Sequence, residues 1–189
     1  MPPSPRRHIL GIDDAPFAKG RDPVVPIVGV LMEGADLVEA VAIASFPVDG
    51  SNATDFLARW ITGLRVRPSV QAVVLGGITI AGLGLVDLIG LAEIIRRPVL
   101  AVTRRDPSNS ELRRALIAAG LDERLPLLER IPPAREIREG LFVAAAGVSP
   151  NEVPKLALAT LGKSNLPESL RVAHLIARAL TMGESRGRV

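Results

Sequence analysis

The chain has 189 residues, of which 48% are hydrophobic and 3% aromatic, and it contains no cysteine and no tyrosine. These numbers predict one folded domain with an aliphatic core, and they exclude disulfides, thiolate metal sites and cysteine nucleophiles. The net charge of +3 comes from a basic set of 20 Arg and 3 Lys. This arginine excess favours planar anionic partners such as phosphate, or it reflects a genomic or thermophilic bias.

The first third of the chain predicts three strands and a helix after a basic leader. The leader 1–7 lacks the apolar run of a signal peptide, and we expect it to be flexible and the protein to be cytoplasmic. Apolar runs bounded by turn residues predict strands at 8–13, 24–32 and 37–46. Ser51 or Asn52 is expected to cap a helix whose apolar face carries Phe56, Leu57, Trp60, Ile61 and Leu64.

From residue 70 onward, strands alternate with helices. The uncharged segment 70–86 is short and glycine-rich for a membrane span, so it is interpreted as a buried strand, a turn and a helix start. The next expected elements are a helix over about 84–96, a strand over 98–103, and a helix opened by the capping-box pair Ser108 and Glu111 and closed by Gly120. A peripheral charged stretch over 121–140 is followed by a strand ending at Gly147 and a helix start at 149–152. The last expected elements are a helix over about 167–182 and a polar tail over 183–189.

This order of elements predicts an α/β fold. Three antiparallel strands and a helix, followed by alternating strands and helices, give a mixed sheet with helices on both faces. The order matches that of ribonuclease H-like proteins. We expect a single domain over residues 1–189.

Five motifs, in order along the chain, resemble the endonuclease V-like family. They are GIDDAPF, PVDGSNATDF, LGGITIAGLGLVDL, PVLAVTRRDP, and NLPESLRVAHLIARAL followed by GESRGR. The chain looks most like the uncharacterised archaeal branch of that family, domain of unknown function 99. The resemblance implies a ribonuclease H-like fold. It also implies descent from endonucleases that use a divalent metal, Mg²⁺ or Mn²⁺, to cleave nucleic acid near deaminated bases, chiefly inosine.

Asp13 is the first candidate metal ligand. It ends the first predicted strand, where the family pattern places its first catalytic aspartate. Phosphodiester hydrolysis on such a fold uses several carboxylates around one or two metal ions. Adjacent side chains on a strand point to opposite faces, so Asp14 is expected to support the turn before Pro16. The alternative for Asp13 is the same kind of turn role.

Asp49 and Asp55 are the candidates for a second acid. The family contributes a glutamate near the first helix, and these two acids are the nearest here. We therefore consider Asp49 as catalytic and metal-binding and Asp55 as metal-binding. The alternatives are structural, because Asp49-Gly50 is a favourable turn and an acid in a first helical turn, such as Asp55, stabilises the helix dipole.

Gly76 departs from the family pattern. Endonuclease V carries Asp-Gly directly after the fourth strand, whereas this chain has Gly76-Gly77. A glycine has no side chain to coordinate a metal, and Asp87 stands eleven residues further on, a poor substitute. Because Mg²⁺ is held by few protein ligands, the loss of one carboxylate is expected to weaken its binding.

The nucleic-acid contacts are expected from a glycine-rich loop and from arginines. Backbone N–H groups around Gly76, Gly77 and Thr79 can approach a phosphate or a flipped base, or the loop can serve close strand–helix packing. Arg104 and Arg105 follow the strand that ends at Thr103, where they can grip phosphate or form an exposed basic patch.

His174 and Arg186 complete the candidate set. His174 shares a helix face with apolar residues, and its imidazole can ligate a metal or contact the scissile phosphate, or it is a core histidine. Arg186 lies in a tail that folds over the site or remains solvated.

Three hypotheses of function follow. The first is a metal-dependent phosphodiesterase of the endonuclease V type that acts on single-stranded RNA or DNA. The second is a catalytically inactive protein that binds nucleic acid or a modified nucleotide through the glycine loop, Arg104 and Arg105. The third is a small-molecule enzyme on the same fold. No membrane partner is expected.

Overall fold

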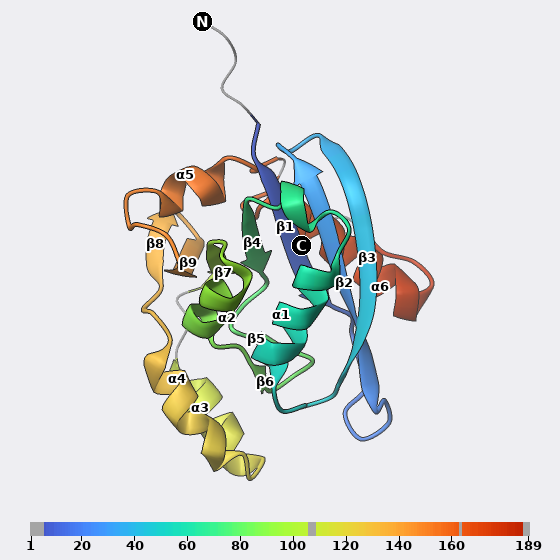
Figure 1. Cartoon of the computed structure of the whole chain (residues 1–189). Helices are drawn as coiled ribbons and strands as arrows, with labels where there is room; N and C mark the ends of the chain where they lie inside the picture. The colour runs from blue at the N-terminus through green and yellow to red at the C-terminus, as the bar shows by residue number, and fades with distance from the viewer. Residues whose placement is uncertain (1–5, 106–108, 163, 187–189) are drawn as a thin grey trace, which may run out of the picture.

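The structure is a computed structural model that describes residues 6–105, 109–162 and 164–186. Part of the expected leader and tail, and Ser108 of the expected capping box, lie outside the described residues. Figure 1 shows the start of β1 (His8–Asp14) at one end of the molecule and α3 (Asn109–Ala118) and α4 (Leu125–Arg130) at the other. In the part that the structure describes, no helix is both long and apolar enough to cross a membrane.

The described residues form nine strands, six α-helices and two short 3-10 turns. The strands are β1 His8–Asp14, β2 Val24–Glu33, β3 Leu37–Pro47, β4 Ala72–Leu75, β5 Thr79–Ile80, β6 Gly84–Leu85, β7 Val99–Thr103, β8 Arg135–Arg138 and β9 Leu141–Ala146. The helices are α1 Ala53–Gly63, α2 Leu88–Ile95, α3 Asn109–Ala118, α4 Leu125–Arg130, α5 Val153–Leu158 and α6 Glu168–Met182, with 3-10 turns at Arg67–Ser69 and Asp122–Arg124.

Seven of the strands form one mixed sheet, in the order β3-β2-β1-β4-β7-β9-β8. The pairs β3–β2 and β2–β1 are antiparallel, β1–β4 and β4–β7 are parallel, and β9 returns antiparallel to β7 and β8. The mixed sheet predicted from the sequence is confirmed. The parallel strands β1, β4 and β7 end at the same edge, which lies toward α3 and α4 in Figure 1.

Helices cover both faces of the sheet. A Cβ at Gly29 of β2 would lie 3.1 Å from the ring of Trp60 on α1, whereas a Cβ at Gly11 of β1 would meet the backbone of α6. Gly11 pairs with Val30, the neighbour of Gly29, so these two contacts are on opposite faces. Between the layers lies an aliphatic core that includes Ile12, Leu57, Leu75 and Leu91, each at most 1% exposed.

One predicted helix start is wrong, and one predicted side-chain cap is absent. The helix expected from about residue 84 begins at Leu88, because residues 79–85 form the hairpin β5–β6 and Asp87 caps the helix through the N–H groups of Ile89 and Gly90. Asn52 occupies the N-cap of α1 but makes no side-chain capping bond, because it adopts a left-handed φ of 61°. Sequence patterns mark that a helix begins without fixing the backbone angles that precede it.

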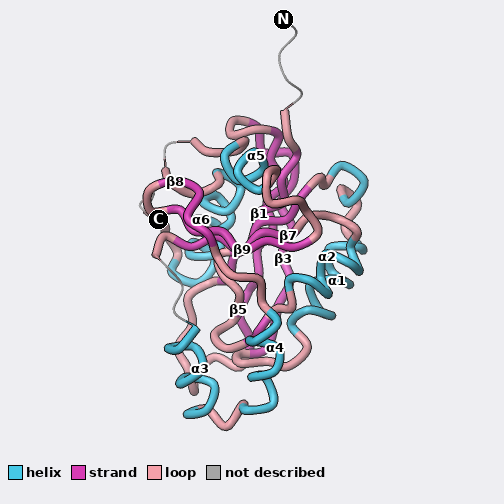
Figure 2. Tube along the Cα trace, turned by 90° about the vertical axis from the view of Figure 1, so that its left-hand side faces the viewer, coloured by secondary structure: helices cyan, strands magenta, loops and turns pink. Residues whose placement is uncertain are grey.

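The prediction that residues 121–140 are peripheral is wrong at Arg124. Its side chain is only 11% exposed, and its guanidinium donates to the carbonyl oxygens of Leu83 at 2.6 Å and of Asp49 at 2.8 Å. Figure 2 shows α3 and α4 as a separate lobe at the end of the molecule that also holds β5. Arg124 therefore ties this lobe to the loops at the carboxyl edge of the sheet.

We predict that Gly11→Ala destabilises the fold by about 1–3 kcal/mol or more, because overpacking against rigid backbone has this cost. The new methyl group would stand 2.3 Å from Leu170 N and Ser169 C in the backbone of α6. Urea unfolding followed by circular dichroism measures the change. Gly63→Ala is the matched control, because its Cβ meets nothing within 4 Å, and it should be neutral or slightly stabilising. Equal stability of Gly11→Ala and wild type would contradict the packing described here.

Candidate active site at the carboxyl edge of the sheet

Asp13 and Gly76 lie side by side where β1 and β4 end. Ile12 pairs with Leu75 in the parallel ladder, so the next residues on each strand, Asp13 and Gly76, are neighbours. A Cβ at Gly76 would lie 2.8 Å from Asp13 Oδ1. The position at which the resemblance to endonuclease V leads us to expect a carboxylate therefore faces Asp13 directly. In this chain that position is a glycine, which has no side chain.

Asp13 is paired with His174. The His174 Nδ1 atom lies 2.7 Å from Asp13 Oδ2, although 161 residues separate the two in the sequence. The two side chains are 17% and 27% exposed, so the pair is open to solvent on one side. Among the described residues neither Asp13 Oδ1 nor His174 Nε2 has a hydrogen-bond partner, which leaves one atom of each side chain available to a ligand.

The absence of a side chain at Gly11 makes this pairing possible. Because Gly11 has no Cβ, the first turn of α6 lies directly against β1 at Ser169 and Leu170. His174 is one helical turn beyond Leu170 and Asp13 is two residues beyond Gly11, so the helix and the strand carry the two side chains to the same place. The His174 imidazole is thus satisfied by the Asp13 carboxylate and is 27% exposed, and its role as a metal ligand or phosphate contact stays a prediction.

Asp14 holds the β5–β6 hairpin. Its Oδ2 accepts a hydrogen bond of 3.0 Å from Ala81 N–H, and Ala81 has a left-handed φ of 49°. Burial, with the nearby charge of Asp13 as a smaller cause, raises the pKa of Asp14 to about 6. The sequence interpretation of Asp14 as a structural residue agrees with this contact, although the partner is 67 positions away and not in the local turn.

Asp49 holds the same hairpin from the other side. Its N–H donates to Ala81 O at 2.9 Å, while its Oδ1 accepts from Leu83 N–H at 2.9 Å and its Oδ2 lies 2.7 Å from Lys19 Nζ. Burial alone would raise the pKa of Asp49, but the hydrogen bonds from Lys19 and Leu83 outweigh it and lower the pKa below its usual value. Both carboxylate oxygens are thus already bound by the protein.

Asp55 is exposed in the first turn of α1. It lines a surface cavity of about 410 Å³ together with Asp87 and the loop before α1. Among the described residues, the one group of three acidic or imidazole side chains close enough to share a metal ion is His8, Glu33 and Glu39. The structure therefore does not gather Asp13, Asp49 and Asp55 as a three-ligand group, and the metal-binding roles of Asp49 and Asp55 stay predictions.

The residues expected to contact nucleic acid come from the glycine loop, the end of β7 and the polar tail. Gly77 has a φ of 142°, which a side chain rarely allows, and Thr79 opens β5. Arg104 and Arg105 are exposed just after β7, and the side chain of Arg186 is 91% exposed near Glu184. Among these residues Gly76 lies directly beside Asp13, and Arg104 and Arg105 follow β7, the strand that neighbours β4.

A cavity of about 210 Å³ opens one strand away from Asp13 and Gly76. Its wall includes Ala101, which neighbours Leu75 across the β4–β7 ladder, and Ile78 of the glycine loop. Thr103, Asn109, Ile131, Pro132, Pro133, Ala134 and Ala144 complete the lining. The cavity is mostly apolar, with one hydroxyl and one amide side chain.

Two residues that hold the loops near the site were not predicted from the sequence. Lys19 is one of three lysines in the chain and lies in a loop that gave no signal, yet it pairs with Asp49. Arg124 lies in a charged stretch that resembles a solvated surface, yet it bonds both the Asp49 turn and the hairpin. Both act across long sequence separations, which local patterns do not encode.

Comparison with solved structures identifies the fold class. Endonuclease V of Ciona intestinalis, solved with a 24mer DNA that contains inosine, has a TM-score of 0.58 at 12% identity, with 89% of this chain and 82% of that chain covered. Endonuclease V of Streptomyces avermitilis has a TM-score of 0.54 at 21% identity, with 96% and 84% covered. The chain has the ribonuclease H-like fold of endonuclease V, as its motifs predicted.

Sequence comparison identifies the family. A model of the endonuclease dU family matches residues 5–181, and the chain belongs to that family. A UPF0215 protein of Methanothermobacter thermautotrophicus is 34% identical over 188 residues, with 95% of this chain and 90% of the relative covered. The crystal structure of an Archaeoglobus fulgidus protein of unknown function has a TM-score of 0.84 at 31% identity, with 93% of this chain and 98% of that chain covered.

We predict that Asp14→Asn removes a component of the pH dependence of stability. The folded-state pKa of about 6 exceeds the reference value of 3.8, so the folded state binds more protons between these pH values and stability falls as pH rises through this window. Asparagine keeps an acceptor for Ala81 N–H without the charge. In EDTA, the variant should therefore be more stable than wild type at pH 8, by on the order of 2–3 kcal/mol, and nearly equal below pH 4.

Urea unfolding of both proteins between about pH 3.5 and about pH 8 measures this difference in stability. Asp55→Asn, which removes an exposed carboxylate, is the matched control and should leave the profile close to wild type. Parallel profiles for Asp14→Asn and wild type would show that Asp14 is not buried as described.

Proposed function

We propose that this protein is a divalent-metal-dependent endonuclease that hydrolyses a phosphodiester bond near a deaminated base in single-stranded RNA or DNA in the cytoplasm. The observation that carries the proposal is the Asp13–His174 pair, which presents a free carboxylate oxygen and a free imidazole nitrogen at one solvent-open point. The family name points to deoxyuridine, and the structural neighbour bound to inosine-containing DNA points to a second deaminated base.

The residues present fit a metal ion that takes one ligand from the protein and most of the others from the bound nucleic acid and water. Asp13 Oδ1 has no protein partner among the described residues, and Gly76 leaves space beside it. Mg²⁺ commonly binds through one or two carboxylates and completes its shell with water and substrate phosphates. When bound, such an ion would activate water and stabilise the charge on the leaving oxygen. Because Gly76 supplies no ligand, we expect metal binding to be weak until the nucleic acid is present.

Asp13 and His174 have complementary roles in this proposal. The bond to Asp13 Oδ2 fixes the orientation of the imidazole and leaves Nε2 without a protein partner among the described residues. From there, Nε2 can donate a hydrogen bond to a phosphate oxygen or transfer a proton to the leaving group. The Asp13 carboxylate supports both functions, since Oδ2 positions His174 and Oδ1 would hold the metal.

The surrounding edge supplies binding groups for nucleic acid. Backbone around Gly76, Gly77 and Thr79 can approach the strand closely, and the exposed Arg104, Arg105 and Arg186 can contact phosphates. The apolar cavity between Ile78 and Ala144 can accept a base turned out of its stack. Asp14, Asp49 and Arg124 hold the β5–β6 hairpin beside these groups.

A second candidate function is binding without cleavage. The specific observation in its favour is Gly76, which stands where the family carboxylate is expected and directly faces Asp13. Such a protein would bind nucleic acid or a modified nucleotide with a salt-dependent affinity, because phosphate contacts release counterions. Cleavage assays separate the two functions.

We predict metal-dependent cutting of oligonucleotides that contain inosine or deoxyuridine, above that of unmodified ones. Asp13→Asn should abolish it, and His174→Ala should reduce it by about 10²-fold or more, the range for a lost proton-transfer group. Labelled single-stranded RNA and DNA in Mg²⁺ or Mn²⁺ provide the assay. Glu93→Gln, which neutralises an exposed carboxylate on α2, is the control and should cut as wild type does.

Other outcomes assign the protein differently. Salt-sensitive binding of the oligonucleotides without cutting by wild type would favour the binding function. Cutting that persists in Asp13→Asn would contradict the proposed site.

A further inference from the structure

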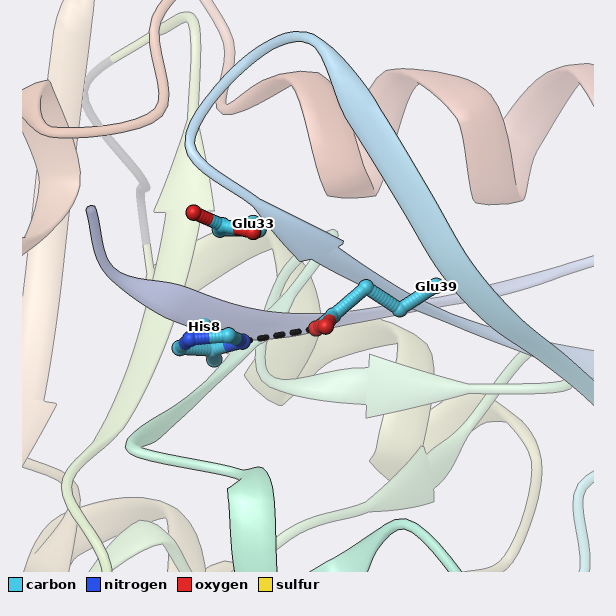
Figure 3. A group of neighbouring side chains, drawn as sticks. All are labelled: His8, Glu33 and Glu39. Atoms are coloured by element: carbon cyan, nitrogen blue, oxygen red, sulfur yellow. Dashed lines mark hydrogen bonds and ion pairs between the residues drawn. The ribbon is translucent and has the colours of Figure 1, made fainter.

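A second group of metal-ligand side chains lies at the opposite end of β1. His8 is the first residue of β1, Glu33 is the last residue of β2 and Glu39 is near the start of β3. One potential ligand atom from each of the three lies within 4.8 Å of the others. Figure 3 shows the three side chains gathered over neighbouring strands. None of them belongs to the edge that carries Asp13.

The backbone brings the three side chains together from three strands. His8 and Glu33 are cross-strand partners, so their side chains share a face of the sheet. In the β2–β3 ladder, Leu31 pairs with Ala40 and Met32 with Val38, which leaves Glu39 as the extra residue of a β-bulge. A bulge redirects its side chain relative to a regular strand. Glu39 reaches across β2, and its Oε2 lies 2.7 Å from His8 Nδ1.

The charge in this group is not balanced by the protein. Among the described residues, neither Glu33 nor Glu39 has a lysine or arginine within ion-pair distance, although the chain contains 23 basic residues. The nearby Arg6 is paired with Asp36 at 3.3 Å. Two carboxylates around one imidazole thus form a site whose unmatched charge suits a cation.

We propose that His8, Glu33 and Glu39 bind one divalent cation of the zinc class, at a site separate from Asp13 and independent of nucleic acid. An imidazole nitrogen with two carboxylates is a ligand set for Zn²⁺ and its neighbours Co²⁺ and Ni²⁺, whereas Mg²⁺ favours oxygen ligands alone. The bound ion takes the place of the His8–Glu39 hydrogen bond. It links the edge strand β3 to β1, so it stabilises the folded state by its binding free energy.

The inference does not depend on the proposed nuclease activity, and its test needs no substrate. Isothermal titration of the full chain with Zn²⁺ and, separately, with Mg²⁺ measures affinity and stoichiometry after treatment with EDTA. We expect one Zn²⁺ per chain, at least about tenfold tighter than Mg²⁺, and a rise in the thermal unfolding midpoint on adding Zn²⁺. His8→Ala and Glu33→Gln should each weaken Zn²⁺ binding by about tenfold or more.

Matched variants separate this site from the rest of the molecule. Asp36→Asn removes a nearby exposed carboxylate that is not a ligand, and His174→Ala removes the only other histidine. Both should bind Zn²⁺ as wild type does. Glu33→Gln is nearly isosteric, so it tests the site even if His8→Ala fails to fold. The proposal is overturned by the lack of saturable one-to-one binding, or by equal weakening in His174→Ala and Glu33→Gln.

Discussion

The contact between β1 and α6 at Gly11 is the constraint on which the candidate active site depends. Because Gly11 has no side chain, the first turn of α6 lies against the strand, and the next turn carries His174 to Asp13. Any side chain at position 11 would displace α6 and separate His174 from Asp13. The stability of the sheet and the geometry of the candidate catalytic groups are therefore set by the same few atoms.

A second set of contacts arranges the loops around that pair. Asp14 and Asp49 hold opposite sides of the residue at the tip of the β5–β6 hairpin, Ala81, which has an unfavourable left-handed backbone. Arg124 joins the hairpin to the turn at Asp49. Asp14 thus holds the backbone of Ala81 and both oxygens of Asp49 are bound by the protein, whereas Asp13 Oδ1 faces Gly76 without a hydrogen-bond partner among the described residues.

Much of the fold follows from local patterns, whereas the site follows from long-range contacts. Alternating and continuous apolar runs located the strands β1, β2, β3 and β7, and the motif order identified the fold. The hairpin β5–β6 was missed because its uncharged, glycine-rich sequence fits a helix start equally well. The edge strand β8 and the inward reach of Arg124 were missed because charged residues resemble a solvated surface until their partners are known. Likewise, only the ladder register shows that Gly76 faces Asp13.

The most direct test of the account is the position of a bound metal. Crystals grown with Mn²⁺ and a non-hydrolysable oligonucleotide that contains a deaminated base would locate the ion by its anomalous scattering. The account predicts an ion in contact with Asp13 Oδ1 and a phosphate oxygen, with the His174 ring beside them. An ordered nucleic acid whose phosphates avoid Asp13, or an ion found only at His8, Glu33 and Glu39, would contradict a metal-dependent nuclease site at the carboxyl edge.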